Sequence, residues 1–131
     1  MRSRSMLIFA AVSGLSYVAL GAFGAHVLSR TLGEPEMSYL RTGLQYQAVH
    51  TLAIMALSVV AERHASLWFY WSGVALAMGV VLFSGSLYCL SLSHLHMWVY
   101  ITPLGGMCLL AGWLLMLAGA LRLKKKAERR E

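Results

Sequence analysis

The chain has 131 residues, of which 59% are hydrophobic and only 12% are charged, and its formal net charge is +6. Soluble domains usually carry about 25% charged residues, so this composition excludes an ordinary soluble globule and indicates a bilayer as the solvent. Six of the eleven Lys and Arg residues lie in the last ten positions. Directly after an apolar run, such a tail is more typical of a protein that meets anionic lipid headgroups than of one that binds nucleic acid.

Four apolar segments follow one another, and each is close to the ~20 residues that cross ~30 Å of hydrocarbon. We expect spans at about 6–28, 36–61, 68–92 and 98–121. Because backbone groups in lipid must be paired internally, each span is predicted to be an α-helix. The fold class is therefore all-α: a polytopic membrane protein whose four transmembrane helices form an up-down bundle. Residues 1–123 make the transmembrane domain and 124–131 a basic cytoplasmic tail.

The first two segments need separate comment. The first begins with Arg2 and Arg4 like a signal peptide, but its apolar region exceeds the usual ~7–15 residues, so we expect a retained helix. The second starts with Pro35 and runs to Ala61, about 40 Å at ~1.5 Å per residue. That exceeds the bilayer core, so its first two turns should stand outside, with Arg41 near the outer interface.

Lys and Arg residues set the predicted orientation. With both termini cytoplasmic, nine of them lie inside and two outside, which the positive-inside rule favours. The sequence therefore predicts a multi-pass protein of the bacterial inner membrane.

Small residues recur at steps of seven and four along the spans, which keeps them on one helix face. Because water cannot drive helices together in lipid, small residues that permit close backbone approach are typical of helix interfaces. We interpret these glycines as packing residues: Gly14, Gly21, Gly24, Gly79, Gly85, Gly105, Gly112 and Gly119.

Polar residues from every span are predicted to gather in the outer half of the bundle. The expected cluster comprises His26, Tyr46, Gln47, His50, Ser84, Ser86, Tyr88 and Thr102. Such groups face the bundle interior or a wet cavity, so two interpretations stay open. The cluster is either a hydrogen-bonded network that specifies packing or a site for a ligand or ion.

Pro103 is expected to kink the fourth span, because it lacks the N–H that would bond the carbonyl of Val99. The alternative makes Thr102 an N-cap and Pro103 the first helical residue. His94 and His96 are a weak metal signal, and a haem held between His26 and His50 has no other support. We expect no metal, no cofactor and no catalytic residue.

The motifs GAFGAH, TGLQYQAVHTLA, FSGSLY and ITPLGG with AGW, in this order, resemble the YgdD-like family of small inner-membrane proteins of uncharacterised function. The resemblance runs from about Phe9 to Leu123. It implies a four-helix membrane fold and these motif positions: Gly21, Gly24, His26, Tyr46, His50, Ser84, Gly85, Ser86, Tyr88, Thr102, Pro103 and Gly106. It implies no activity.

The leading functional hypothesis is a non-enzymatic accessory or interaction protein, with a membrane-protein partner or a second copy of itself. The rival hypothesis is a small-solute or ion transporter or channel subunit, with a pocket that faces the periplasm. A transporter predicts a solvated cavity that reaches His50 and an internal repeat or oligomeric pore, whereas an accessory protein predicts a dry monomer with an exposed small-residue or aromatic seam.

Overall fold

The computed structural model describes the backbone of residues 2–128 and the side chains of residues 3–123. Over that range the chain forms four long helices: α1 (Arg2–His26), α2 (Glu34–Arg63), α3 (Leu67–Ser93) and α4 (Ile101–Glu128). Two short 3-10 helices, η1 (Leu28–Arg30) and η2 (His96–Tyr100), lie in the connections. All four long helices are long and apolar enough to cross a membrane, which confirms the predicted all-α, four-span fold.

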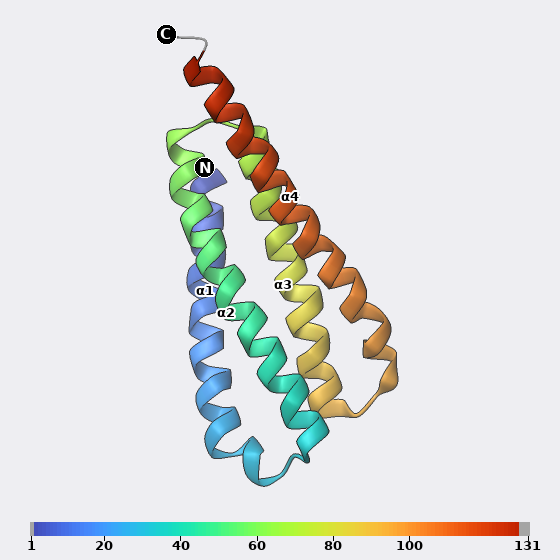
Figure 1. The fold of residues 1–131 in the computed structure, drawn as a ribbon. Coiled ribbons are helices and arrows are strands. Elements are labelled where there is room, and N and C mark those ends of the chain that lie inside the picture. Colours follow the sequence, from blue (N-terminus) through green and yellow to red (C-terminus); the bar gives the residue numbers. More distant parts are fainter. Residues whose placement is uncertain (1, 129–131) are drawn as a thin grey trace.

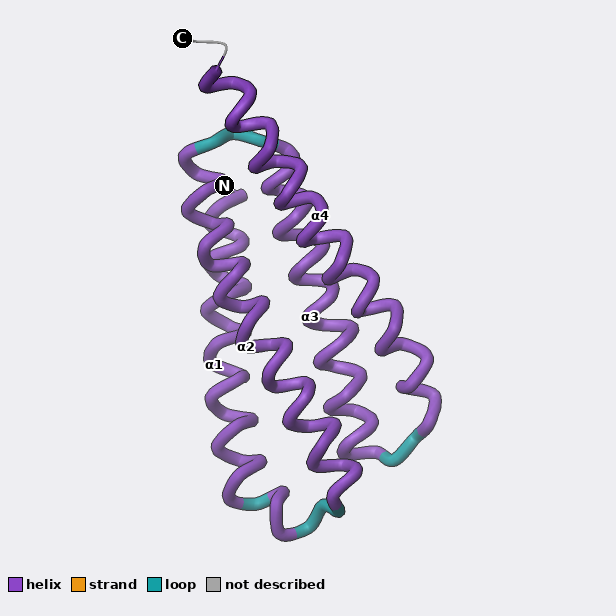
Figure 2. Tube along the Cα trace, in the orientation of Figure 1, coloured by secondary structure: helices purple, strands orange, loops and turns teal. Residues whose placement is uncertain are grey.

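The helices run alternately up and down, so both termini lie at the same end of the molecule (Figure 1). The α2–α3 turn lies at that end, whereas the α1–α2 and α3–α4 connections lie at the other. Loops are short and confined to the two ends (Figure 2). Residues 124–128 of the expected basic tail continue α4, and 129–131 lie outside the described residues.

The local sequence explains where α2 begins. Gly33 is the N-cap of α2, and Pro35 lies in its first turn with Glu34 and Glu36, which favour the positive end of the helix dipole. The helix has 30 residues, so at ~1.5 Å per residue it is longer than the bilayer core. An exposed ion pair, Arg41 to Glu34 at 3.6 Å, lies on the turns expected to stand outside.

The helix α3 is the central element of the fold. It packs extensively against α4 on one side and α2 on the other, while α1 packs mainly against α2. The core is built from side chains of all four helices: Met6, Ala10, Ile54, Leu57, Phe69, Leu76, Val80 and Leu109. Among the described elements, α4 makes more than marginal contact only with α3 and η2. The bundle is therefore open between α2 and α4.

Glycines explain how closely α4 approaches α3. A Cβ on Gly105 would lie 2.3 Å from the backbone nitrogen of Phe83, and one on Gly112 would lie 2.5 Å from the side chain of Leu76. Gly79 on α3 is equally tight against Leu109. These predicted packing positions therefore require glycine, and Gly24 and Gly119 also meet neighbouring atoms within 3.0 Å.

Three other glycines that we expected to pack closely do not do so. At Gly14, Gly21 and Gly85 no neighbouring atom lies within 4 Å of where a Cβ would stand. A seven-residue step places small residues on one face, but it does not decide whether a neighbouring helix covers that face.

The expected mid-helix kink at Pro103 is also corrected. The chain passes from the 3-10 helix η2 into α4 at Ile101, so Pro103 lies in the first turn of α4. An N–H in that turn has no partner within the helix, so proline costs no hydrogen bond there. Thr102 is not an N-cap either, because its Oγ1 donates to the carbonyl of Trp98 at 3.2 Å.

Gly105→Ala should destabilise the protein by about 1–3 kcal/mol, since the added methyl group meets backbone that cannot yield without moving α4. The measurement is the thermal midpoint in detergent. Gly21→Ala is the matched control, because its methyl group enters open space. Equal midpoints for the two variants would contradict the tight α3–α4 contact.

Candidate functional site

Gln47 is the centre of a buried polar network that joins three helices. Its Nε2 donates to the carbonyl of Ser13 and to Oγ of Ser16, both at 2.8 Å, and its Oε1 accepts from the hydroxyl of Tyr88. The hydroxyls of Ser13 and Thr51 lie 2.6 Å apart. The amide of Gln47 is thus bonded at both ends, to α1 and to α3, and is only 4% exposed.

Gly43 makes room for this network. A Cβ there would lie 2.7 Å from the ring of Tyr88, so only glycine lets that ring cross α2 at this level. The carbonyl of Gly43 accepts from Oγ of Ser84 at 2.7 Å. Gln47, Ser84 and Tyr88 therefore come together at the α2–α3 interface.

Two other serines of α3 also donate a hydrogen bond to a backbone carbonyl of a neighbouring helix, as Ser84 does. Ser72 donates to the carbonyl of Gly112 at 2.7 Å, and Ser91 donates to that of Glu36 at 2.9 Å. Ser86 is within 2.6 Å of the hydroxyl of Thr102. Polar contacts therefore run along the whole of α3, including Ser72 near the end that carries the termini, and are not confined to the outer half.

His50 is held in a single neutral tautomer. An indole N–H can only donate, so the 3.0 Å contact from Nε1 of Trp113 requires a lone pair on Nε2 of His50. The proton is then on Nδ1, which donates to the carbonyl of Tyr46 at 2.7 Å. Both ring nitrogens are engaged, so a metal or haem iron could bind His50 only by displacing one of these bonds.

The ring of His50 belongs to an aromatic group that lines a cavity on the open side of the bundle. Tyr46 stacks on His50 at 5.8 Å and contacts Phe83 at 4.4 Å, and Trp113 meets His50 edge-on at 5.9 Å. We call this cavity the α2–α4 groove. Its volume is about 550 Å³, and it is lined by Tyr46, Val49, His50, Phe83, Pro103, Gly106, Met107, Leu109, Leu110 and Trp113.

His26 stands apart from the other expected cluster residues. It is the last residue of α1 and is exposed, and its side chain makes no hydrogen bond or ion pair with the described residues. At the same end His94 lies 3.4 Å from Glu36. The residues expected to form one cluster thus fall into three groups: the Gln47 network, the aromatic group at His50, and the Ser86–Thr102 pair. His26 belongs to none of them.

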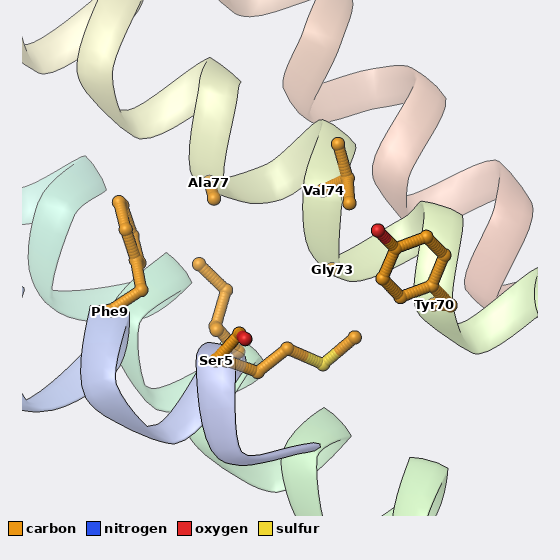
Figure 3. A pocket seen from close by; sticks show the side chains of 8 residues that line it. Ser5, Phe9, Tyr70, Gly73, Val74 and Ala77 are labelled. Carbon is orange, nitrogen blue, oxygen red and sulfur yellow. The ribbon is translucent and has the colours of Figure 1, made fainter. Parts of the chain in front are cut away.

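A further cavity, which the sequence did not predict, lies between α1, α2 and α3 near the termini. It has a volume of about 430 Å³. Ser5 and Phe9 of α1 face Tyr70, Gly73, Val74 and Ala77 of α3 across it (Figure 3). The side chain of Met6 reaches across to Gly73, where a Cβ would lie 2.5 Å from its terminal carbon. Methionine fills irregular gaps of this kind, so we interpret the cavity as imperfect packing.

Sequence reasoning missed four residues of these groups: Ser13, Ser16, Thr51 and Trp113. A spacing signal was available for three of them. Ser13 and Ser16 are three residues apart, and Gln47 and Thr51 are four apart, so each pair shares a helix face. No comparable signal connects Trp113 with His50, because they lie on helices that do not pack closely against each other.

Gln47→Leu should lower the free energy of unfolding by about 2 kcal/mol. It removes several interhelical hydrogen bonds, which average ~0.6 kcal/mol each in membrane proteins, and it leaves the hydroxyl of Tyr88 without an acceptor. Thermal unfolding in detergent measures the loss. Gln45→Leu is the control on the same helix, since Gln45 is exposed. If both variants unfold at the wild-type midpoint, the network does not hold the helices together.

Comparisons with known proteins agree on one family. Residues 20–106 match the family model described as "Protein of unknown function (DUF423)". The chain is 66% identical over 126 residues to the UPF0382 inner membrane protein YgdD of Escherichia coli K12, covering 96% of each. It is 41% identical to a UPF0382 membrane protein of Haemophilus influenzae, covering 90% of this chain and 94% of that one.

A UPF0382 membrane protein of Staphylococcus haemolyticus is 38% identical over 111 residues, covering 85% of this chain and 90% of its own. No solved structure matches. With four helices able to span a bilayer and relatives named as inner membrane proteins, the chain is a multi-pass protein of the inner membrane. It belongs to the DUF423 (UPF0382) family of membrane proteins of unknown function.

Proposed function

We propose that the protein is a non-enzymatic accessory or interaction protein, and that the α2–α4 groove receives a transmembrane helix of a membrane-protein partner. The observation that carries the proposal is the open side of the bundle. The helices α2 and α4 flank α3 without packing closely against each other, and a single hydrogen bond, from Trp113 to His50, joins them at the groove.

The lining of the groove suits a helix. Val49, Met107 and Leu110 are more than half exposed along its rim, and Gly106 leaves the backbone of α4 uncovered between them. Helices associate in lipid by close packing against small residues, so this combination favours a packed partner. The rings of Tyr46 and Phe83 supply a rigid apolar wall, which costs little conformational entropy to cover.

The transport hypothesis draws less support from the same cavity. Only Tyr46, His50 and Trp113 among the lining residues carry side-chain polar atoms, and two of these three are bonded to each other. A path for ions or polar solutes needs groups that can replace water, whereas this wall is mostly aliphatic and aromatic.

We also propose that the end carrying both termini faces the cytoplasm, where the basic tail meets anionic headgroups. The nine Lys and Arg residues at that end against two at the other support this orientation. Alkaline phosphatase fused after residue 131 should be inactive in cells, and the same fusion placed in the α3–α4 connection after Leu95 should be active. The opposite pattern would reverse the orientation.

The interaction itself is tested by photo-crosslinking in cells. A photoreactive amino acid replaces Leu110 in the groove or, as the control, Leu114 one turn further along α4; both are 66% exposed. We expect a discrete protein adduct from position 110 and lipid adducts alone from position 114, with mass spectrometry identifying the partner. Lipid adducts alone at both positions, or one shared set of protein adducts, would contradict the proposal.

A further inference from the structure

A cationic cavity lies at the end of the molecule that carries the termini, between the α2–α3 turn and the end of α4. We call it the basic cavity. Its volume is about 350 Å³, and it is lined by Arg63, His64, Ala65, Ser66, Trp68, Gly119, Arg122 and Leu123. The guanidinium groups of the two arginines give the cavity two positive charges.

Neither arginine forms an ion pair with any side chain that the structure describes. Among the residues whose side chains are described, the ion pairs are Arg41 with Glu34 and His94 with Glu36, both at the opposite end. Glu62 is adjacent to Arg63 in the chain, but it is exposed and does not line the cavity. Two guanidinium groups in one concavity, with no ion-pair partner among residues 3–123, favour an anion with several oxygens.

Two further features position that anion. The helix α3 begins at Leu67, where Oγ of Ser66 accepts from the backbone N–H of Trp68 at 3.3 Å, so the positive end of the helix lies at the cavity. The guanidinium carbon of Arg122 stands 4.5 Å from the centre of the Trp68 ring. This cation–π contact orients Arg122 without neutralising it.

An apolar groove leads away from the basic cavity along α3 and α4, and Trp68 lines both. We call it the α3–α4 groove. Its volume is about 630 Å³, and it is lined by Leu67, Trp68, Trp71, Val74, Ala75, Met78, Cys108, Ala111 and Leu115. From Trp68 to Met78 the helix rises about 15 Å, at ~1.5 Å per residue. That is half of a ~30 Å hydrocarbon core, so the groove has the length of one leaflet.

We propose that the basic cavity and the α3–α4 groove together bind one anionic phospholipid, its phosphodiester between Arg63 and Arg122 and one acyl chain in the groove. A cationic cavity next to an apolar groove of one-leaflet length favours a lipid over free phosphate, because free phosphate has no apolar part that could occupy the groove. The positive group of a zwitterionic headgroup would be repelled by the two arginines, so the site selects anionic headgroups. The proposed site uses Arg63 and Arg122 and does not require residues 124–131.

The test is quenching of tryptophan fluorescence by phospholipids brominated at mid-chain, because Trp68 and Trp71 line the α3–α4 groove. The full-length protein is reconstituted in phosphatidylcholine vesicles that contain increasing fractions of brominated phosphatidylglycerol or brominated phosphatidylcholine. Quenching of Trp98 and Trp113 is measured in the W68F/W71F variant and subtracted. We expect half-maximal quenching at an at least fivefold lower fraction of the anionic lipid. Equal quenching by the two lipids in the wild-type protein overturns the proposal without any variant.

Variants then locate the selectivity. Arg63→Gln with Arg122→Gln should abolish the preference, whereas Arg30→Gln with Arg41→Gln, which removes two charges at the other end, should keep it. Ala111→Leu should weaken quenching by both lipids by filling the groove. Loss of the preference on changing Lys124, Lys125 and Lys126 to Gln, with none on changing the two arginines, would assign it to the tail and overturn the proposal. Displacement of the lipid by millimolar inorganic phosphate would make this a phosphate site and overturn it as well.

Discussion

A polar group inside hydrocarbon must find its partner within the protein, and serines of α3 meet that requirement where α3 touches its neighbours. Ser72, Ser84 and Ser91 of α3 each donate to a backbone carbonyl of a neighbouring helix at 2.7–2.9 Å. A serine side chain is short, so such a bond forms only if the two backbones lie close together. At Gly43 and Gly112 the accepting residue is itself a glycine, which permits that approach. Polar pairing and close packing are therefore one constraint along α3, and together they replace the hydrophobic force that is missing in lipid.

The open side of the bundle follows from this central role. Since α3 holds α2 with one part of its surface and α4 with another, α2 and α4 are kept apart, and the α2–α4 groove remains between them. The bond from Trp113 to His50 pairs the indole N–H with the imidazole, so the apolar walls of the groove are not interrupted by an unpaired imidazole. The partner helix that we propose would then leave neither the imidazole nor the indole without a hydrogen bond, a penalty of about 1–3 kcal/mol for each such group.

The sequence predicts those parts of this arrangement that depend on local composition. Hydropathy and length locate the four spans, and Pro35 with its flanking carboxylates marks the start of α2, because helix formation in lipid is decided within each segment. The rotation of each helix is set by its neighbours, and there the prediction was partial. Gln47 and Tyr88 do meet, yet His26 lies exposed beyond the network. The same heptad step marks Gly105, which meets Phe83 closely, and Gly21, which meets no neighbour. Only the packed structure distinguishes them.

The helix α4 forms one wall of both grooves and one side of the basic cavity, while α1 borders none of the three. Its position is fixed by glycine contacts with α3 that leave no room for a methyl group, so these surfaces are preformed. Binding to a preformed surface costs less conformational entropy than binding that must first order the site. It also follows that a displacement of α4 would alter the α2–α4 groove and the proposed lipid site together, whereas a change on the outer face of α1 would leave both intact. By thermodynamic linkage, any effect of a bound lipid on the affinity for a partner must be matched by an equal effect of the partner on the affinity for lipid.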